Sequence, residues 1–491
     1  MIMKKNSLYI WLLGVSFICS SCHDFFKESS QDEIKPSTVE DLRSVMYKEA
    51  YPYQFASDNY LMLLTDEMQC NGLLIDQYAT QHANGTPVFT FNPMMFDGGE
   101  VFPDVDVNSW KIYYEKIKGC NVIIDYVSEV SGTEQEKNAL LGQATLLRGF
   151  YHLKLAMIYC QAYTASGVDP KTALGVPLML TMDLTDDYPE RPSLEALYSQ
   201  IEQDFLTATS LLEENYTPDN VYRVGSVAAY VLLSRFYLFR GGDEDLDKAI
   251  QYAGMAIEKG PMLSRLSMLM GTDKSIYDSD MSSEVVWCYG GYSFKVNTYF
   301  PTDAYQSIVP WSVSTELLSL YTTNDLRDDI YFQSFTAGPG GVYGEKIGLN
   351  SSYGGDHGIR MAEAYLNRAE ANAELGHTDL ALDDIEHLRK YRFEVEVPIT
   401  VSTKTDVVQL VRQERRFELC FEQHRWFDLR RWDRPRIEHI YTTDMNSSQK
   451  VKFVLEENDK AYTLPLPVEV KEFDYNLENI NRPERKGVIV Q

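Results

Sequence analysis

Cysteine and histidine are scarce in this chain, which has 7 Cys and 8 His among 491 residues. The five cysteines after residue 22 are scattered and form no C-x-x-C pair: Cys70, Cys120, Cys160, Cys288 and Cys420. An odd, sparse set of this kind excludes a disulfide framework and a clustered zinc site. We therefore expect these five residues to be buried free thiols.

Basic residues are also few, with 45 Lys and Arg against 72 Asp and Glu, so the formal net charge is −27. This acidity argues against nucleic acid and other polyanions as partners. Signatures of chemistry are missing as well. The glycine-rich turn at 338–341 lacks the phosphate-loop pattern, and no nucleophile–base motif is present. The sequence therefore predicts no catalytic residue, no metal site and no cofactor.

Only one long apolar run is present, from Leu8 to Ile18, and it follows Lys4 and Lys5. The run has the length of a signal peptide and is too short for a comfortable membrane span. Small residues then lead to Cys22, as in a bacterial lipobox, where the cysteine is diacylated and tethers the mature protein. We predict a lipoprotein signal peptide over 1–21 and a palmitate-type anchor on Cys22. An ordinary secretory signal that is cut nearby is the alternative.

Helical periodicity dominates the rest of the chain. Apolar and small residues recur at helical spacing over about 360–390, with Gly376 in the turn, which is typical of a tetratricopeptide-like hairpin. A second compact hairpin is predicted over about 226–259, and two further pairs are split by insertions. The sequence thus predicts a mainly α fold with four helical hairpins that form a short solenoid.

A third helix is expected after the second of these hairpins, over about 407–431, and it carries the densest charge pattern of the chain. Glu414, Glu418 and Glu422 repeat every four residues beside His424. This pattern fits a metal or acid–base site, and it also fits carboxylates that pair with the interleaved arginines to brace the helix. The spacing is not that of the H-E-x-x-H zinc signature, so we favour ion pairs.

Two loop-rich segments interrupt the helices, at about 70–108 and 261–358, and no helical period survives over 72–106. They divide the helical scaffold into about 37–260 and 313–432, and an extended segment over 433–491 follows. Long irregular insertions are uncommon unless they are functional. A calcium ion near Glu100, Asp104 and Asp106 is conceivable, but a solvated acidic loop is the preferred interpretation.

Several short motifs, in this order along the chain, are similar to those of one family. The clearest are 146–153 (LLRGFYHL), 359–370 (IRMAEAYLNRAE), 415–419 (RRFEL), 425–429 (RWFDL) and 464–467 (LPLP). With them the chain resembles the SusD/RagB family of outer-membrane nutrient-binding lipoproteins from Bacteroidetes. No single motif is specific, but the ordered set covers nearly the whole mature chain, taken as one nutrient-binding domain over 22–491.

The resemblance implies a fold and a function. The fold is a scaffold of four tetratricopeptide-like hairpins with a loop-rich, minor-β region packed on one side. The function is that of a cell-surface lipoprotein of the outer membrane. It captures an oligosaccharide and delivers it to a SusC-like TonB-dependent outer-membrane transporter. A peptide receptor of the same architecture is the alternative, and a hydrolase is the third hypothesis.

Ligand-binding residues are expected in the loop-rich segments, because flat aromatic faces stack on sugar rings while polar groups reach the hydroxyls. The candidates are Tyr78, Phe96, Tyr292, Asn297, Tyr299 and Trp311. Asp76 and Gln77 are the expected polar partners in the first segment. The alternative for each aromatic residue is that it packs its own loop. Four other tryptophans lie in helical or strand patterns and are predicted to be core residues: Trp110, Trp287, Trp426 and Trp432.

Overall fold

The structure is a computed structural model, and the part of the chain that it describes has several gaps. The described residues are 35–52, 58–74, 76–96, 109–182, 190–272, 275–289, 309–334, 342–344, 357–467, 469–470, 477 and 482–490. Cys22, Glu100, Asp104 and Asp106 lie outside these residues. None of the helices in the described ranges is long and apolar enough to cross a membrane.

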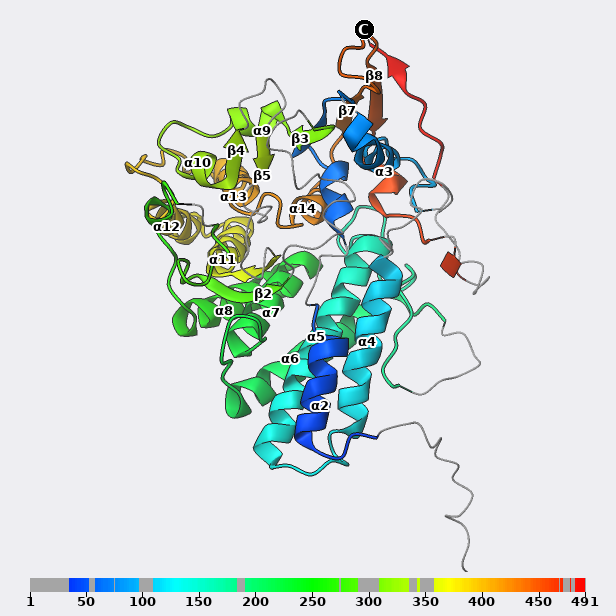
Figure 1. Ribbon diagram of the computed structural model, residues 1–491. Coiled ribbons are helices and arrows are strands. Elements are labelled where there is room, and N and C mark those ends of the chain that lie inside the picture. Colours follow the sequence, from blue (N-terminus) through cyan, green and yellow to red (C-terminus); the bar gives the residue numbers. More distant parts are fainter. Residues whose placement is uncertain are drawn as a thin grey trace, which may run out of the picture.

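The first half of the scaffold is a row of long helices that pack in sequence order (Figure 1). α4 (Ser109–Tyr126) packs on α5 (Glu134–Tyr159), which in turn packs on α6 (Leu194–Asn215). α7 (Ser226–Arg240) lies between α6 and α8 (Asp243–Lys259). At 1.5 Å per residue, the 26 residues of α5 form a rod about 39 Å long.

The second half continues the same stacking. α11 (Met361–Leu375) and α12 (Thr378–Arg389) form a hairpin, and α11 also packs on α8 and on α13 (Lys404–Glu418). Gly376 ends α11 with a φ of +86°, a left-handed conformation that suits glycine. The hairpins predicted over 226–259 and 360–390 are therefore confirmed as α7–α8 and α11–α12, and the mainly α fold is confirmed with them.

Small residues allow these helices to approach closely. Ala249 and Ala256 on α8 and Ala362 and Ala369 on α11 are completely buried. A buried ion pair adds to the contact between α7 and α11, where Arg235 Nε and Nη2 donate to the two carboxylate oxygens of Glu363 at 2.5 and 2.6 Å. The scaffold is thus held by close helix packing and by charges that are paired inside it.

The segment over 79–89 corrects one prediction. It forms the helix α3 (Ala79–Phe89), although the sequence pattern predicts no helix there. A tertiary contact explains the difference, because a Cβ atom on Gly85 would lie only 2.5 Å from the Trp311 ring. The helix therefore lies directly on that ring. Pro87 sits in the last turn, and its carbonyl accepts the Asn92 N–H at 2.9 Å.

The charged helix predicted over 407–431 is also corrected, because it is two helices. α13 ends at Glu418, and α14 (Arg425–Arg431) begins after a buried turn. Within this turn Phe421 and Gln423 have φ values of 60° and 64°. Left-handed conformations are rare for residues other than glycine, and they end a helix.

Among the described residues, the strands are short and pair antiparallel in four small sheets. The pairs are β1 (Met68–Cys70) with β3 (Trp311–Val313), β2 (Val285–Tyr289) with β6 (His357–Arg360), and β4 (Phe332–Ser334) with β5 (Val342–Gly344). The fourth sheet has the order β7 (Ile437–Tyr441), β8 (Val451–Leu455) and β9 (Val488–Ile489). Sheet β1–β3, the β7–β9 sheet and α3 lie at the end of the molecule away from the start of α2 (Val39–Val45) (Figure 1).

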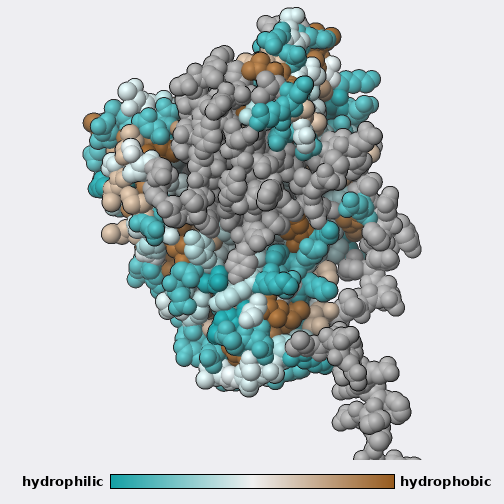
Figure 2. All heavy atoms as spheres, in the orientation of Figure 1, coloured by the Kyte–Doolittle hydropathy of each residue, from teal (hydrophilic) through white to brown (hydrophobic). Residues whose placement is uncertain are grey.

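Short elements complete the described fold. The two remaining α-helices are α9 (Thr315–Ser319) and α10 (Arg327–Tyr331). Short 3₁₀ or π segments are η1 (Met46–Ala50), η2 (Asn59–Leu64), η3 (Asp76–Tyr78), η4 (Leu266–Met268) and η8 (Lys460–Tyr462). The outer surface of the scaffold that faces the viewer is mostly hydrophilic (Figure 2).

Candidate functional site

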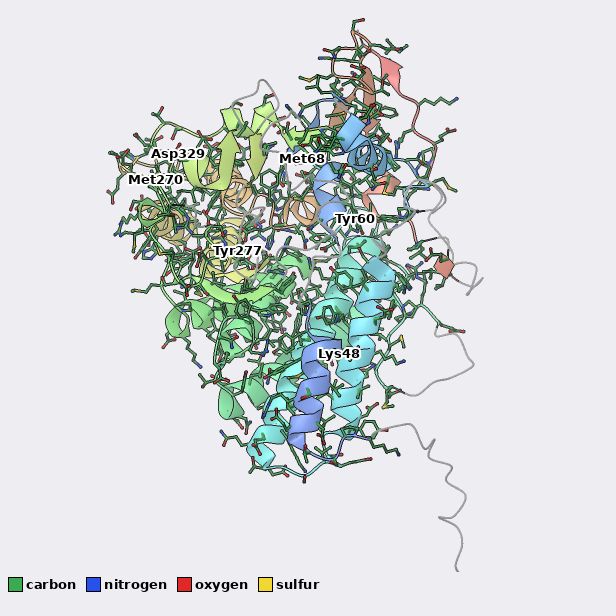
Figure 3. The ribbon with its side chains drawn as sticks, in the orientation of Figure 1. Lys48, Tyr60, Met68, Met270, Tyr277 and Asp329 are labelled. Atoms are coloured by element: carbon green, nitrogen blue, oxygen red, sulfur yellow. The ribbon has the colours of Figure 1, made fainter. Side chains whose placement is uncertain are left out.

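The two loop-rich segments meet through a backbone ladder. β1, at the start of the first segment, pairs with β3 within the second, with Gln69 opposite Ser312. Asn71 extends the ladder, because its N–H donates to the Pro310 carbonyl at 2.8 Å and its Nδ2 donates to the Val309 carbonyl at 2.9 Å. Met68 and Tyr60 mark this region above the ends of α4 and α5 (Figure 3). Segments about 240 residues apart in sequence thus share one end of the molecule.

A continuous column of stacked and tilted rings holds α3 against β3 and β7. In order, its rings are Phe91, His439, Phe89, Trp311, His82 and Tyr441, with successive centroid distances of 4.6, 4.1, 5.0, 5.4 and 5.5 Å. Aromatic pairs at such distances stabilise beyond their buried area. The column therefore fixes the position of η3 and α3, the first of the predicted ligand-binding regions.

Trp311 is an interior member of this column. Its side chain is fully buried, and its Nε1–H donates to the carbonyl of Gln81 at 2.9 Å. The rings of His82 and Phe89 pack on the indole. The structure therefore gives Trp311 a packing role, and the ligand-binding role that the sequence predicts for it stays a prediction.

The other candidates are spread over several environments. Tyr78 is buried at the end of η3, whereas Asp76 and Gln77 on the same turn are exposed. Phe96 is half-buried, with its ring 5.1 Å from that of Tyr60 in an edge-on arrangement. The three candidates of the second segment lie outside the described residues: Tyr292, Asn297 and Tyr299. Of the candidates that the structure describes, Tyr78 on η3 is brought near Trp311 through α3.

His439, which the sequence analysis does not select, lies at the centre of the column. Its Nδ1 is 2.6 Å from the carbonyl oxygen of Phe89, and its Nε2 is 3.0 Å from that of Thr65. Burial lowers the pKa of His439, and these two carbonyl contacts oppose the shift. His439 thus joins the end of α3 to the segment before β1. A lone histidine in an extended stretch gives no sequence signal for such a role.

The carboxylates of the charged region are paired with arginines, as predicted. Glu418 accepts from Arg392 Nε at 2.8 Å and from Arg360 Nη1 at 3.0 Å. Glu414 accepts from Arg327 at 3.1 Å, and Glu422 accepts from Arg360 Nε at 3.1 Å. Within the described ranges, no cluster of three or more His, Cys, Asp or Glu side chains is arranged to hold a metal ion. These carboxylates therefore form ion pairs that stabilise the protein interior.

The tryptophans and thiols also follow the sequence predictions. Trp110, Trp287, Trp426 and Trp432 are all buried. The five cysteines after residue 22 are free; four are buried and Cys70 is half-buried. Burial raises the pKa of Cys70 to about 11, so this thiol stays protonated at neutral pH.

Two family models match separate parts of the chain. One, described as the SusD family, matches residues 340–486, and the other, described as starch-binding associating with outer membrane, matches residues 37–238. The chain belongs to the SusD family. No curated protein sequence matches it significantly.

Solved structures of SusD-family proteins share the whole fold. A SusD superfamily protein from Bacteroides thetaiotaomicron VPI-5482 is 21% identical, with a TM-score of 0.71 over 91% of this chain and 100% of its own. A SusD superfamily protein from Bacteroides fragilis is 18% identical, with a TM-score of 0.69 over 90% and 100%. A SusD-like carbohydrate binding protein from Bacteroides vulgatus ATCC 8482 is 19% identical, with a TM-score of 0.65 over 90% and 97%.

Proposed function

We propose that this SusD-family protein binds an oligosaccharide with the end of the molecule where its two loop-rich segments meet. The observation that carries the proposal is the ladder between β1 and β3, which joins both segments beside α3. The exposed polar groups of Asp76 and Gln77 lie on the turn that leads into α3. Proteins often carry their binding residues on loops that a rigid scaffold positions.

The ligand class follows from family and charge. One relative with the same fold is described as carbohydrate binding, and one of the matching models is described as starch-binding. The net charge of −27 disfavours polyanionic ligands. We therefore propose a neutral glycan, with Tyr78, Phe96, Tyr292, Asn297, Tyr299 and Trp311 as the residues to test first.

The test is calorimetry with the soluble chain that begins at residue 23. It is titrated with a panel of neutral polysaccharides, uronic acid polymers and a peptide digest. Binding of a neutral glycan supports the proposal. Binding of peptides alone would overturn it in favour of a peptide receptor. Chromatography of the glycan after incubation provides the control for catalysis, and any shortening of the chains would favour a hydrolase.

We also propose that the mature protein is tethered to the outer membrane through a lipid on Cys22 and faces the cell exterior. Lys35 follows Cys22 by thirteen positions, and a fully extended chain of that length spans at most about 45 Å. Radioactive palmitate should label the wild-type protein and should not label Cys22→Ala. Protease added to whole cells tests the orientation, since an exposed protein is degraded without lysis.

A partner transporter is the third part of the proposal. The bound glycan is handed to a SusC-like TonB-dependent transporter, and the helical scaffold over 37–260 and 313–432 forms one nutrient-binding unit with the loop-rich segments. Affinity purification of the tagged protein from outer membranes should recover a large β-barrel protein in stoichiometric amount. Recovery of the tagged chain alone under mild detergent would contradict this part.

A further inference from the structure

Glu67 is a buried acid at the junction between the loop-rich end and the helical scaffold. It lies between η2 and β1, and only 2% of the residue is exposed. Its Oε2 accepts the backbone N–H of Phe421 at 3.3 Å. Its Oε1 has no hydrogen-bond partner among the described residues. An ionised carboxylate in this position would be poorly solvated.

The cations beside Glu67 are bound to its neighbour. Arg425 donates to both carboxylate oxygens of Asp66, at 2.8 and 2.7 Å, and Arg416 lies 3.0 Å from the same carboxylate. Asp66 therefore holds the charge that these two guanidinium groups neutralise. On the side of β7, His439 contacts the Thr65 carbonyl.

The other groups around Glu67 are neutral or already paired. On the turn that Glu67 contacts, Cys420 is a buried thiol, and Glu422 is paired with Arg360 and accepts from the Tyr277 hydroxyl. His424 lies 3.2 Å from Arg415 Nη2. Within the described residues, the cations that stabilise ionised Glu67 are Arg425 and Arg416, and it shares both with Asp66.

The turn that receives the Glu67 contact is strained. Phe421 and Gln423 both have positive φ values, a backbone conformation that is unfavourable for residues with a Cβ atom. Side-chain contacts hold this conformation, because Gln423 Oε1 accepts from Lys154 at 2.9 Å and Gln423 Nε2 donates to Asn59 at 3.1 Å. A strained turn of this kind relaxes when one of its contacts is lost.

We propose that Glu67 is a protonation-dependent latch, whose neutral carboxyl holds the β1 segment against the strained turn over 419–424 and whose ionised form releases it. The latch connects the proposed ligand-binding end to the scaffold, so its effect on ligand affinity rests on the proposed function. Its effect on the junction does not depend on any ligand.

The sign of the pH dependence follows from the environment. Burial raises the pKa of Glu67 from an ordinary value of 4.5 to about 7, and Arg425 and Arg416 only partly oppose this. A raised pKa in the closed junction means that the latch is strongest below pH 4.5. Its contribution declines as the pH rises from 4.5, and it is lost once the pH passes about 7.

Amide hydrogen exchange of the chain that begins at residue 23 tests the latch without a ligand. The observed exchange rates, divided by the intrinsic rates, give the equilibrium constant for opening of 65–71 and 419–424. In the wild type this constant should increase about tenfold per pH unit between pH 5 and 7 and level off at pH 8. Glu67→Gln, which imitates the neutral acid, should show no such slope. The comparison variant Asp66→Asn frees Arg425 and Arg416 to neutralise Glu67, so it should shift the slope to lower pH.

A second measurement needs no variant. The 13Cδ chemical shift of Glu67 in isotopically labelled wild-type protein should titrate near pH 7. Titration near pH 4.5, or equal slopes in wild type and Glu67→Gln, would overturn the latch. If exchange behaves as expected but glycan affinity is unchanged between pH 5 and 8, the latch stands and its link to the binding site is refuted. Absence of any glycan binding refutes only the proposed function.

Discussion

Arg148 on α5 and Asp204 on α6 form a bidentate ion pair in which Nε and Nη2 each lie 2.8 Å from a carboxylate oxygen. The two side chains are only 10% and 3% exposed. Arg148→Ala should therefore destabilise the protein by about 3–5 kcal/mol, because it leaves Asp204 buried without its partner. Urea denaturation measures this loss. The control is Arg436→Ala, at an exposed pair, and it should leave the midpoint unchanged.

The environment of Glu370 predicts that the folded protein loses stability at low pH. Its carboxylate accepts from Arg431 Nη1 and Nη2 at 2.7 Å each and from the Trp432 indole at 2.7 Å. Burial acts to raise the pKa of Glu370, but Arg431 outweighs it and lowers the value to about 2. The stabilisation is complete above pH 4.5 and is lost as the pH falls towards 2, and it amounts to about 3 kcal/mol.

Glu370→Gln tests this pH dependence. Denaturation midpoints of wild type and variant should differ most at pH 6 and converge by pH 2. A difference that stays constant over this range would show that the carboxylate charge contributes nothing and that only the hydrogen-bond geometry matters.

The left-handed backbone conformation of Gly376 predicts that replacing this glycine destabilises the protein. Its φ of +86° is unfavourable for a residue with a Cβ atom, while the nearest atom to that Cβ would be Lys404 Cδ at 3.9 Å. Gly376→Ala should thus destabilise by about 1 kcal/mol through backbone strain alone. Gly254→Ala is the matched control, because Gly254 lies in α8 and a Cβ atom there would meet only Arg368 Nη1, at 3.9 Å. It should leave stability equal or slightly higher.

Two substitutions of Trp311 separate packing from ligand binding. Trp311→Ala should cost about 3–5 kcal/mol by opening a cavity in the ring column. Trp311→Phe keeps a ring between His82 and Phe89 and should cost less. If packing is the only role, glycan affinity is unchanged in Trp311→Phe at a temperature where it is folded. A large loss of affinity in that variant would instead favour the predicted role in ligand binding.

Gln423 combines strain with two useful hydrogen bonds. Gln423→Ala should be destabilising, because Lys154 and Asn59 each lose one buried hydrogen bond. Gln423→Gly should be about 1 kcal/mol less destabilising than Gln423→Ala, since glycine relieves the left-handed conformation. Thermal denaturation of both variants provides the comparison. An identical loss in the two would mean that the turn carries no strain.

The sequence predicts the helical hairpins because their signal is local. The apolar period of α11 and α12, the small residues at their crossing and Gly376 between them all lie within thirty residues. The pairing of Glu414, Glu418 and Glu422 with arginines is predictable for a similar reason, since the opposite charges are dense in one stretch.

Features that depend on distant contacts are missed. α3 forms on Trp311, which is more than 200 residues away in sequence, and its own composition predicts a loop. The turn after α13 is set by Lys154 and Asn59, so the helix pattern runs through it without a break. An aromatic residue in a loop also looks the same whether it faces a ligand or packs inside, as Trp311 does.

The entry of the chain into the helical bundle sets its response to force. Val39 N–H donates to the Ser131 carbonyl, and Ser131 N–H donates to the Ser37 carbonyl, each at 2.9 Å. These two bonds fasten the segment before α2 to the turn between α4 and α5. A force that pulls on the N-terminal segment therefore acts first on these two hydrogen bonds. The long helices of the bundle bear the force only after both bonds have broken. Tension applied there would loosen α2 long before it disturbed the β1–β3 ladder at the other end.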